Sequence, residues 1–319
     1  MAVRVGLIGA GAVGARHART LAGFGDVELI GICDARPAAP DAVAAECGIP
    51  VVDGPDELLR SGPDAVWLCV PPFAHGDLEG AMVRAGVPFF VEKPLAADVR
   101  VAEQVARAVA SAGLPTATGY HWRHLDTVEQ ARVALGERPV RLAGVRWWGA
   151  TPPPVWWSSE HLSGGQVVEQ ATHVLDLLRV LVGEVREVVG GAAPSTAEGR
   201  DVPDATAAVL RFDSGAVGTV STSCVLSSLT EAALDVVADG VAVCLSETSL
   251  RLRTAEGDVV TEPVVDGRRA VDRAFVDVLS GRPAPPALVD VAEALRTHRL
   301  ACAVAAATRT GTAVRVGEA

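Results

Sequence analysis

Lysine is almost absent from this chain of 319 residues. Lys and Arg together number 28, and every one except Lys93 is arginine. Tyrosine is equally scarce, since Tyr120 stands alone, and aromatic residues make up only 4% of the chain. Because the other basic positions use arginine, the lone lysine, directly before a proline, indicates a place where arginine would not serve.

Basic runs and long apolar segments are also missing. The formal net charge is -11 and no cluster of Lys and Arg is present, which argues against nucleic-acid or anionic-membrane partners. No apolar run reaches the ~18 residues of a membrane span, and the start "MAVRVGLIGAGAVG" lacks the pattern of a signal peptide. We therefore expect a cytoplasmic protein that binds neither nucleic acid nor membrane.

The six cysteines are scattered, and no two of them lie close together in the sequence. Cys33, Cys69 and Cys244 sit inside apolar, strand-like runs. This usage is typical of buried, reduced thiols in the cytoplasm, so neither disulfides nor a metal centre are expected.

The first 120 residues alternate apolar runs with helical patterns. The runs are "VRVGLIG", "VELIGICD", "AVWLCV", "VPFFVEK" and "PTATGY", and helical segments are predicted near residues 12–23, 40–47, 76–85 and 98–112. Apolar strands separated by helices predict a parallel sheet covered on both faces. We expect residues 1–120 to form an α/β domain with a doubly wound parallel sheet.

After Tyr120 the pattern changes. Helices are predicted near residues 125–135, 167–182, 268–280 and 288–308, with a series of strand-like runs among them. Short turns such as "DSG" and "ADG" predict an open, mostly antiparallel sheet. We expect residues 121–319 to form a substrate-binding α+β domain with helices on one face of its sheet. The other face would be exposed and favours a homodimer or homotetramer.

A glycine-rich turn follows the first strand run. "GLIGAGAVGARHA" places Gly9, Gly11 and Gly14 in G-x-G-x-x-G spacing between a strand and a helix. These glycines permit a tight turn, the approach of a pyrophosphate and close helix–strand packing, which predicts a Rossmann dinucleotide site. Asp34 follows at the distance where a carboxylate accepts the ribose hydroxyls and favours NAD. Arg36 is close enough to hold a 2′-phosphate, so NADP remains open.

Lys93 lies in "VEKP" at the end of a strand of the first domain. Ligands of doubly wound sheets bind beyond the carboxyl ends of the strands, so we expect Lys93 on the same edge as the glycine turn. Pro94 restricts Lys93 to an extended conformation, which helps to aim its side chain. A partly buried lysine can exchange a proton near neutral pH, whereas arginine stays protonated.

Together these motifs resemble the Gfo/Idh/MocA oxidoreductase family, which includes glucose-fructose oxidoreductase and inositol 2-dehydrogenase. The resemblance rests on the glycine turn with His17 after it, "DARP", "VPPFAHGDLEGAMVRAGVPFFVEKPLA", "TGYHWRH" and "GGQVVEQATHVLDLLR". It implies that Lys93 contacts substrate and assists proton transfer, and that Glu169 and His173 represent the family's Asp-x-x-x-His pair. Glu169 departs from the family, because Asp is more usual at that position.

The candidate site residues form three sets. The catalytic set is Lys93, His173 and Glu169. The substrate-binding set is Lys93, Tyr120, Arg123, Trp156, Glu169 and His173. The cofactor-binding set rests on the glycine motif and on the resemblance, which implies that Pro71, Pro72 and His75 border the nicotinamide half of the cofactor. The set is Gly9, Gly11, Ala12, Val13, Gly14, Asp34, Arg36, Val70, Pro71, Pro72, His75, Glu92 and Lys93.

The residues themselves support the second-domain helix. Glu169, His173 and Asp176 are spaced i, i+4 and i+7, on one face of the predicted helix, and the flanking positions are mostly apolar. A narrow polar stripe on an otherwise buried helix needs polar partners, which a substrate cleft would supply. The alternative is a core histidine satisfied by its neighbours. Asp176 is expected to be structural, and no third ligand has the spacing of a metal site.

Some side chains have two interpretations each, contact with substrate or cofactor, or simple packing. They are Tyr120, His121, Arg123, His124, Trp156 and Trp157. The tryptophan pair would suit an aromatic floor for a sugar ring. His17 and His298 are expected to be ordinary helix residues.

The predicted reaction is hydride transfer between NAD and a carbon that bears a secondary hydroxyl in a sugar, cyclitol or amino-sugar derivative. His173 would take the hydroxyl proton, Lys93 would stabilise the oxygen or relay the proton, and Glu169 would orient the imidazole or bind another hydroxyl. Two alternatives are an NAD-dependent glycosidase without net redox change, implied by the family, and a non-catalytic NAD-binding regulator.

Overall fold

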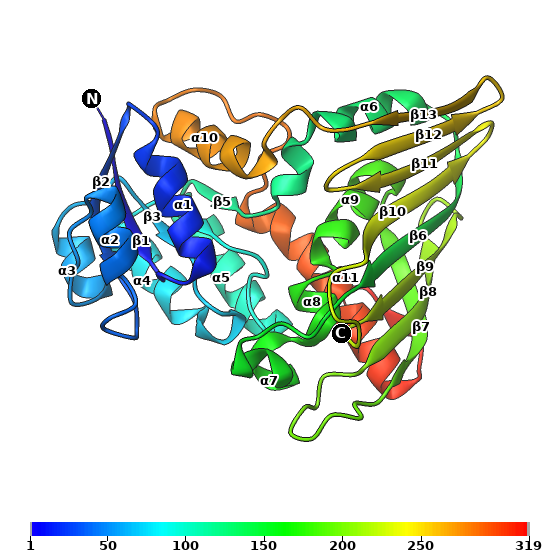
Figure 1. Cartoon of the computed structure of the whole chain (residues 1–319), viewed down its shortest axis with the longest axis horizontal. Coiled ribbons are helices and arrows are strands. Elements are labelled where there is room, and N and C mark those ends of the chain that lie inside the picture. The colour runs from blue at the N-terminus through cyan, green and yellow to red at the C-terminus, as the bar shows by residue number, and fades with distance from the viewer. Residues whose placement is uncertain (1, 318–319) are drawn as a thin grey trace. The chain divides into compact units, whose positions relative to one another are not determined.

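The computed structural model describes residues 2–317, which divide into two compact units (Figure 1). The first unit contains the chain up to Ala96, Arg100–His121 and Arg268–Leu295. The second contains Ala97–Val99, Trp122–Gly267 and the chain from Arg296 onward. The segment Arg268–Leu295 thus belongs to the first unit although it follows the strands of the second in the sequence.

The first unit is built on a five-stranded parallel sheet with strand order β2-β1-β3-β4-β5. This order has a topological switch point between β1 and β3, as doubly wound sheets do, and it confirms the predicted fold class. The strands are β1 (Val3–Ile8), β2 (Val27–Cys33), β3 (Ala65–Leu68), β4 (Phe89–Val91) and β5 (Thr116–Thr118).

Two apolar clusters cover the two faces of this sheet. Trp67 and Phe90 point into one cluster, with α1, α2 and α10, whereas Leu68 and Phe89 point into the other, with α3, α4 and α5. Neighbouring residues of a strand face opposite sides, so each strand contributes to both clusters. The helices are α1 (Ala12–Ala22), α2 (Asp41–Cys47), α3 (Pro55–Arg60), η1 (Pro72–Ala74), α4 (Asp77–Ala85), α5 (Val99–Ala112) and α10 (Gly267–Leu279).

The second unit contains a nine-stranded sheet with strand order β13-β12-β11-β10-β6-β9-β8-β7-β14. Only β6 and β9 are parallel neighbours, which confirms the mostly antiparallel prediction for the described residues. The sequence patterns do not predict β7 or β14, because β7 ends in weak strand formers, "GGAA", and β14 has two residues. The strands are β6 (Val140–Trp148), β7 (Val185–Ala193), β8 (Ala205–Phe212), β9 (Val217–Ser223), β10 (Glu231–Ala238), β11 (Val241–Ser246), β12 (Leu250–Thr254), β13 (Gly257–Thr261) and β14 (Val314–Arg315).

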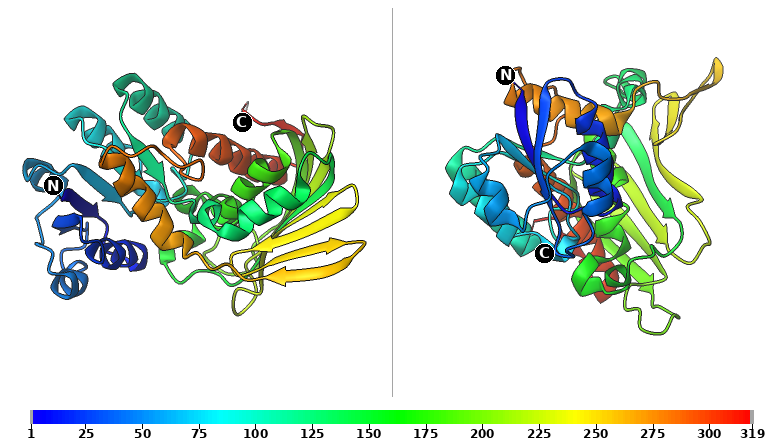
Figure 2. Two further views of the ribbon diagram at one scale, coloured as in Figure 1. Left: turned by 90° about the horizontal axis from the view of Figure 1, so that it is seen from above. Right: turned by 60° about the vertical axis from the view of Figure 1, so that its left-hand side comes forward.

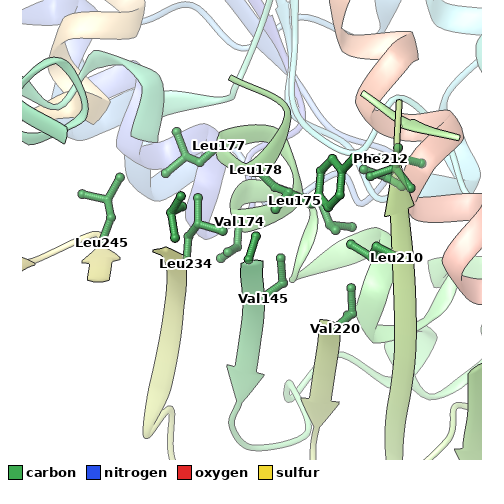
Figure 3. Close-up of a cluster of buried hydrophobic side chains, with 14 of the residues drawn as sticks. Val145, Val174, Leu175, Leu177, Leu178, Leu210, Phe212, Val220, Leu234 and Leu245 are labelled. Atoms are coloured by element: carbon green, nitrogen blue, oxygen red, sulfur yellow. The ribbon is translucent and has the colours of Figure 1, made fainter. Parts of the chain in front are cut away.

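Helices pack on one face of the second sheet (Figure 2). Val174, Leu177 and Leu178 of α9 face Val145 and Leu234 on the strands (Figure 3). Residues of α6 and α11 complete this core, and alternate strand residues on the opposite face are exposed. The helices are η2 (His121–His124), α6 (Asp126–Leu135), η3 (Val155–Ser158), α7 (Glu160–Ser163), α8 (Gly165–Glu169), α9 (Thr172–Val182) and α11 (Val291–Thr310).

The helices and the cysteines of the described chain bear on the expectations for membrane spans and disulfides. Among residues 2–317, each helix is too short or too polar to reach across a membrane. All six cysteines lie in this range as free thiols, and Cys33, Cys69 and Cys224 are buried.

Candidate active site

The carboxyl ends of the five parallel strands meet at one edge of the first sheet. Within three residues of these ends follow Gly9, Asp34, Pro71, Lys93 and Tyr120. Doubly wound sheets bind their ligands at this edge. The structure therefore gathers the predicted cofactor residues of the first unit, and Lys93 with them, around a single edge.

The turn between β1 and α1 has room only beside Gly11. Gly9 has a φ of 99°, and a Cβ there would overlap the carbonyl oxygen of Cys69. A Cβ on Gly14 would overlap the carbonyl oxygen of Gly9, so α1 approaches β1 closely only with glycine. A Cβ on Gly11 would meet nothing within 4 Å, and no side chain caps α1 at this residue. Open space thus lies over the helix N-terminus, where Ala12 and Val13 begin α1, and the turn fits a pyrophosphate.

Asp34 is tied to the same turn. Its Oδ2 accepts a hydrogen bond from the Ala10 amide at 2.8 Å, and its Oδ1 accepts bonds from the Arg36 amide at 2.9 Å and Arg36 Nε at 3.3 Å. Partial burial acts to raise the pKa of Asp34, but these hydrogen bonds outweigh it and lower the pKa. The carboxylate therefore stays charged beside the glycine turn.

His75 follows Val70, Pro71 and Pro72 at the end of η1. Its Nδ1 lies 2.6 Å from Glu79 Oε1, and Glu79 Oε2 accepts a hydrogen bond from the Gly76 amide at 2.6 Å. The His75 side chain is buried, and its Nε2 has no hydrogen-bond partner within the described chain. A buried ring nitrogen without a partner fits a hydrogen bond to a bound cofactor.

Glu92 and His17 form a buried cluster directly before Lys93. His17 Nε2 donates to Glu92 Oε1 at 2.9 Å, and His17 Nδ1 donates to Asp272 Oδ1 at 2.7 Å. The prediction that His17 is an ordinary helix residue is therefore wrong, because its ring is 1% exposed and joins two carboxylates. The available signal was its spacing, since His17 lies one turn after Gly14 on the face of α1 that packs on the sheet. The Lys93–Pro94 peptide bond is cis.

His298, which is expected to be an ordinary helix residue, lies within the helix α11. It is fully buried in α11, and its Nε2 lies 3.6 Å from Cys302 Sγ.

In the second unit, His173 lies in a stack of aromatic rings. Its ring is 5.8 Å from that of Trp122 at an angle of 8°, and 6.5 Å from that of Trp147 at 22°. The imidazole belongs to the second residue of α9 and is 7% exposed. The helix and the two indoles thus fix the ring plane, which suits a general base that must point in one direction.

The predicted helix 167–182 is in fact two helices, α8 and α9. The amides of Gln170 and Ala171 both donate to the Gln166 carbonyl, at 2.9 and 3.1 Å, which widens the turn and ends α8. Glu169 and His173 therefore lie on different helices, and their predicted i, i+4 spacing on one helix is wrong. The helix breaks because the Ala171 amide bonds the carbonyl five residues earlier. The pattern of apolar residues in the sequence does not predict such a bond.

Glu169 is held by the tryptophan-rich loop. Its Oε2 accepts a hydrogen bond from Trp157 Nε1 at 2.9 Å. Trp157 is fully buried with Val202 and Cys224, and Trp156 is half-buried against the same cluster. The loop thus positions the carboxylate that stands where Asp is more usual in the family.

Asp176 belongs to an ion pair inside the second unit. Both of its oxygens accept hydrogen bonds from Arg123, each at 2.6 Å, and Oδ1 also accepts one from Thr297 at 2.8 Å. The Asp176 side chain is 1% exposed and that of Arg123 is 9% exposed. This geometry agrees with the structural role expected for Asp176. It also places Arg123, a predicted substrate ligand, in a largely buried pair.

Tyr120 is 1% exposed and packs in the apolar cluster on one face of the first sheet. Contact of this ring with a ligand remains a prediction. Among residues 2–317, no set of three or more His, Cys, Asp or Glu side chains is arranged to hold a metal ion.

Comparison with known proteins identifies the family. Residues 3–120 match the sequence model described as "Oxidoreductase family, NAD-binding Rossmann fold", and residues 131–240 match the "GFO/IDH/MocA C-terminal domain". The chain is 32% identical to a myo-inositol dehydrogenase, Hyg17, of Streptomyces leeuwenhoekii over 68% of each chain. The chain belongs to the Gfo/Idh/MocA oxidoreductase family. The resemblance stated from its motifs is thereby confirmed.

Two further proteins are similar to this chain. The chain is 31% identical to an inositol 2-dehydrogenase of Rhizobium meliloti over 58% of this chain, and the match spans 56% of that relative. The crystal structure of the WlbA dehydrogenase from Bordetella pertussis, solved with NADH and UDP-GlcNAcA, superposes with a TM-score of 0.84. That match covers 99% of each chain at 23% identity, and it confirms the fold.

Proposed function

We propose that this family member is an NAD-dependent dehydrogenase that transfers hydride between nicotinamide and a secondary hydroxyl or ketone of a sugar, cyclitol or amino-sugar derivative. The observation that carries the proposal is the place of the lone lysine, Lys93, at the sheet edge that holds the glycine turn and Asp34. The inositol dehydrogenases among its relatives support a polyhydroxylated substrate.

The cofactor fits the residues of the first unit. The open space at Gly11 and the N-terminus of α1 would hold the pyrophosphate, and Asp34 would accept the ribose hydroxyls. Pro71 and His75 would border the nicotinamide. NAD is favoured by the charged Asp34 carboxylate, and Arg36 leaves NADP as the second candidate.

Bound nicotinamide supplies the hydride chemistry, and the chain manages the substrate proton. His173, its ring plane set by Trp122 and Trp147, accepts the hydroxyl proton. Lys93 donates a hydrogen bond to the same oxygen and stabilises the charge that develops there. Glu169, held by Trp157, orients the imidazole or binds another hydroxyl.

The test measures reduced-nicotinamide absorbance with a panel of polyols and sugars. We expect Lys93→Met and His173→Ala to lower kcat at least ~100-fold, since each removes a group that handles the proton. NAD binding should stay intact in His173→Ala, because His173 is not among the predicted cofactor-binding residues. His161→Ala, at an exposed histidine, is the matched control and keeps the parent rate. Turnover of the two site variants within a few-fold of the parent defeats the assignment.

The same panel separates the other two functions. Retained NAD and substrate cleavage without net NADH would identify a glycosidase-type enzyme. NAD binding by the parent without turnover of any substrate would identify a regulator.

We also propose that the chain works in the cytoplasm as a homodimer or homotetramer. The free thiols of all six cysteines support a reducing compartment. The outer face of the second sheet supports self-association, because Leu142 is paired in register with Val237 on one side and Val217 on the other. These three side chains are 46%, 40% and 48% exposed.

A further inference from the structure

Both ring nitrogens of His17 face carboxylate oxygens. Nδ1 lies 2.7 and 2.9 Å from the two oxygens of Asp272, and Nε2 lies 2.9 Å from Glu92 Oε1. Carboxylates only accept hydrogen bonds, so both nitrogens carry hydrogen and the ring is an imidazolium. Burial lowers the pKa of His17, but Asp272 and Glu92 outweigh it and raise the pKa to about 9.

The cluster is anchored by elements far apart in the sequence. Asp272 belongs to α10, and its Oδ1 also accepts a hydrogen bond from Trp67 Nε1 of β3 at 2.9 Å. Arg16 Nη2 lies 3.4 Å from Glu92 Oε1 and adds a second, partly exposed cation. The imidazolium is therefore fixed to the sheet and to α10 at once, and it presents Nε2 to Glu92.

Glu92, held by His17, in turn bonds the backbone of Lys93. Its Oε2 accepts a hydrogen bond from the backbone amide of Lys93 at 3.1 Å. Its carboxylate also lies against the backbone after β5, where a Cβ on Gly119 would come within 2.6 Å of Oε1. Glu92 is 6% exposed, so its side chain is committed to the interior.

We propose that His17 and Asp272 are positioning residues for Lys93. They hold the Glu92 carboxylate inside the first unit, and that carboxylate holds the backbone from which the Lys93 side chain leaves. Apolar residues of similar volume would stabilise the first unit about as well as this buried ionic cluster. Stability alone therefore does not explain the charges, whereas a role in positioning Lys93 does. The proposal rests on the proposed function only in taking Lys93 as a catalytic residue.

The single lysine makes a direct test practicable. Reductive methylation with ¹³C-formaldehyde labels two amines, the N-terminus and Lys93, so one NMR methyl signal reports on Lys93 without any assay of activity. In His17→Gln we expect the Lys93 signal to shift and broaden, because Glu92 loses its fixed partner. His161→Gln, at an exposed histidine, is the matched control and leaves the signal in place.

Kinetics provide the second readout. His17→Gln should lower kcat for the preferred polyol by ~10-fold or more, because a displaced Lys93 side chain is badly placed for the proton. The KM for NAD should change less than kcat, since most of the predicted cofactor contacts, the glycine turn among them, are untouched. Asp272→Asn, which keeps the link from His17 to Glu92, should give a smaller loss of the same kind. A merely structural role would lower the melting temperature without this split between kcat and KM.

Each result decides the proposal. An unchanged Lys93 signal in folded His17→Gln overturns it, and if that variant does not fold, the Lys93 signal of Asp272→Asn decides instead. Failure of both variants to fold assigns the cluster to stability alone and also overturns the proposal. A parent that oxidises no substrate defeats the proposed function, whereas the NMR comparison still decides the positioning of Lys93.

Discussion

At the scale of the residue, His17 shows how a buried ring couples the first unit to pH. Its pKa rises from an ordinary 6.5 to about 9, because Asp272 and Glu92 outweigh the effect of burial. The pKa of Glu92 is raised by burial but lowered more strongly by the hydrogen bond and charge of His17, and then by Arg16 and Lys93, to about 2. Each charge therefore stabilises the other in the folded state.

These shifts predict how stability depends on pH. The His17 contribution is complete below about pH 6.5 and is lost as the pH rises through about 9, because the folded state holds the proton more tightly. The Glu92 contribution is present above about pH 4.5 and is lost as the pH falls through about 2. We expect the free energy of unfolding, measured by urea denaturation, to fall between pH 6.5 and 9 in the parent.

His17→Gln is the comparison for this prediction, because it removes the titrating group and should flatten the pH dependence in that window. Burial raises the pKa of Cys33 to about 11 and that of Cys69 well above 9, so these thiols also lower stability as the pH nears and passes 9. They do so equally in parent and variant, and the difference in slope therefore reports on His17. An equal slope in parent and variant would contradict the assignment of the proton to His17.

At the scale of the element, the Asp176–Arg123 pair ties three helices of the second unit together. Asp176 belongs to α9, Arg123 to η2, and Thr297 of α11 donates to Asp176 as well. Arg179 of α9 donates to the same Thr297 at 2.7 Å, which extends the network along the helix. Such a network fixes the helix that carries His173 relative to its neighbours within the unit.

Asp176→Ala should destabilise the protein by about 3–5 kcal/mol, because it leaves the Arg123 guanidinium buried without its carboxylate. Chemical denaturation measures this loss. The matched control is Asp239→Ala, whose partner Arg141 lies 3.3 Å away in an exposed pair, and it should cost about 0–1 kcal/mol. A stable Asp176→Ala variant without activity would show instead that Asp176 takes part in the reaction.

At the scale of the whole molecule, the outer face of the second sheet exposes apolar side chains that a monomer would leave in water. Inner strand residues enter a core with α9 and α11, whereas Leu142, Val217 and Val237 form an exposed apolar row on the other side. Apolar residues adjacent in this way favour burial against a second copy.

Leu142→Glu should therefore dissociate the oligomer, since the carboxylate would have to be buried in the contact. Light scattering after size-exclusion chromatography measures the mass, with a dimer or tetramer expected for the parent and a monomer for the variant. Val133→Glu, on α6 and 67% exposed, is the control and should leave the mass unchanged. A monomeric parent would disprove the proposed assembly.

The sequence predicted the strands best where the local pattern was unambiguous. The runs "ATAAVLRF" and "VAVCLS" coincide with β8 and β11, and Asp34, selected by its spacing, lies hydrogen-bonded to the glycine turn. The sequence patterns did not predict β7, where glycine and alanine weaken the strand pattern. They also did not predict the break between α8 and α9, which depends on the Gln166 carbonyl accepting hydrogen bonds from two amides. The roles of Lys93, Glu169 and His173 remain predictions that the proposed variants test.

The sequence by itself determined the alternation of apolar strands and helices, the glycine turn and the family, because these depend on neighbours within about twenty residues. Only the tertiary structure decided the partners of His17, since Asp272 lies 255 positions away and no local pattern links them. It likewise decided the packing of the His173 ring against those of Trp122 and Trp147 and the bond from Trp157 to Glu169. A buried polar group takes its partner from whatever the packing brings within reach, and that choice is made only when the whole chain has folded.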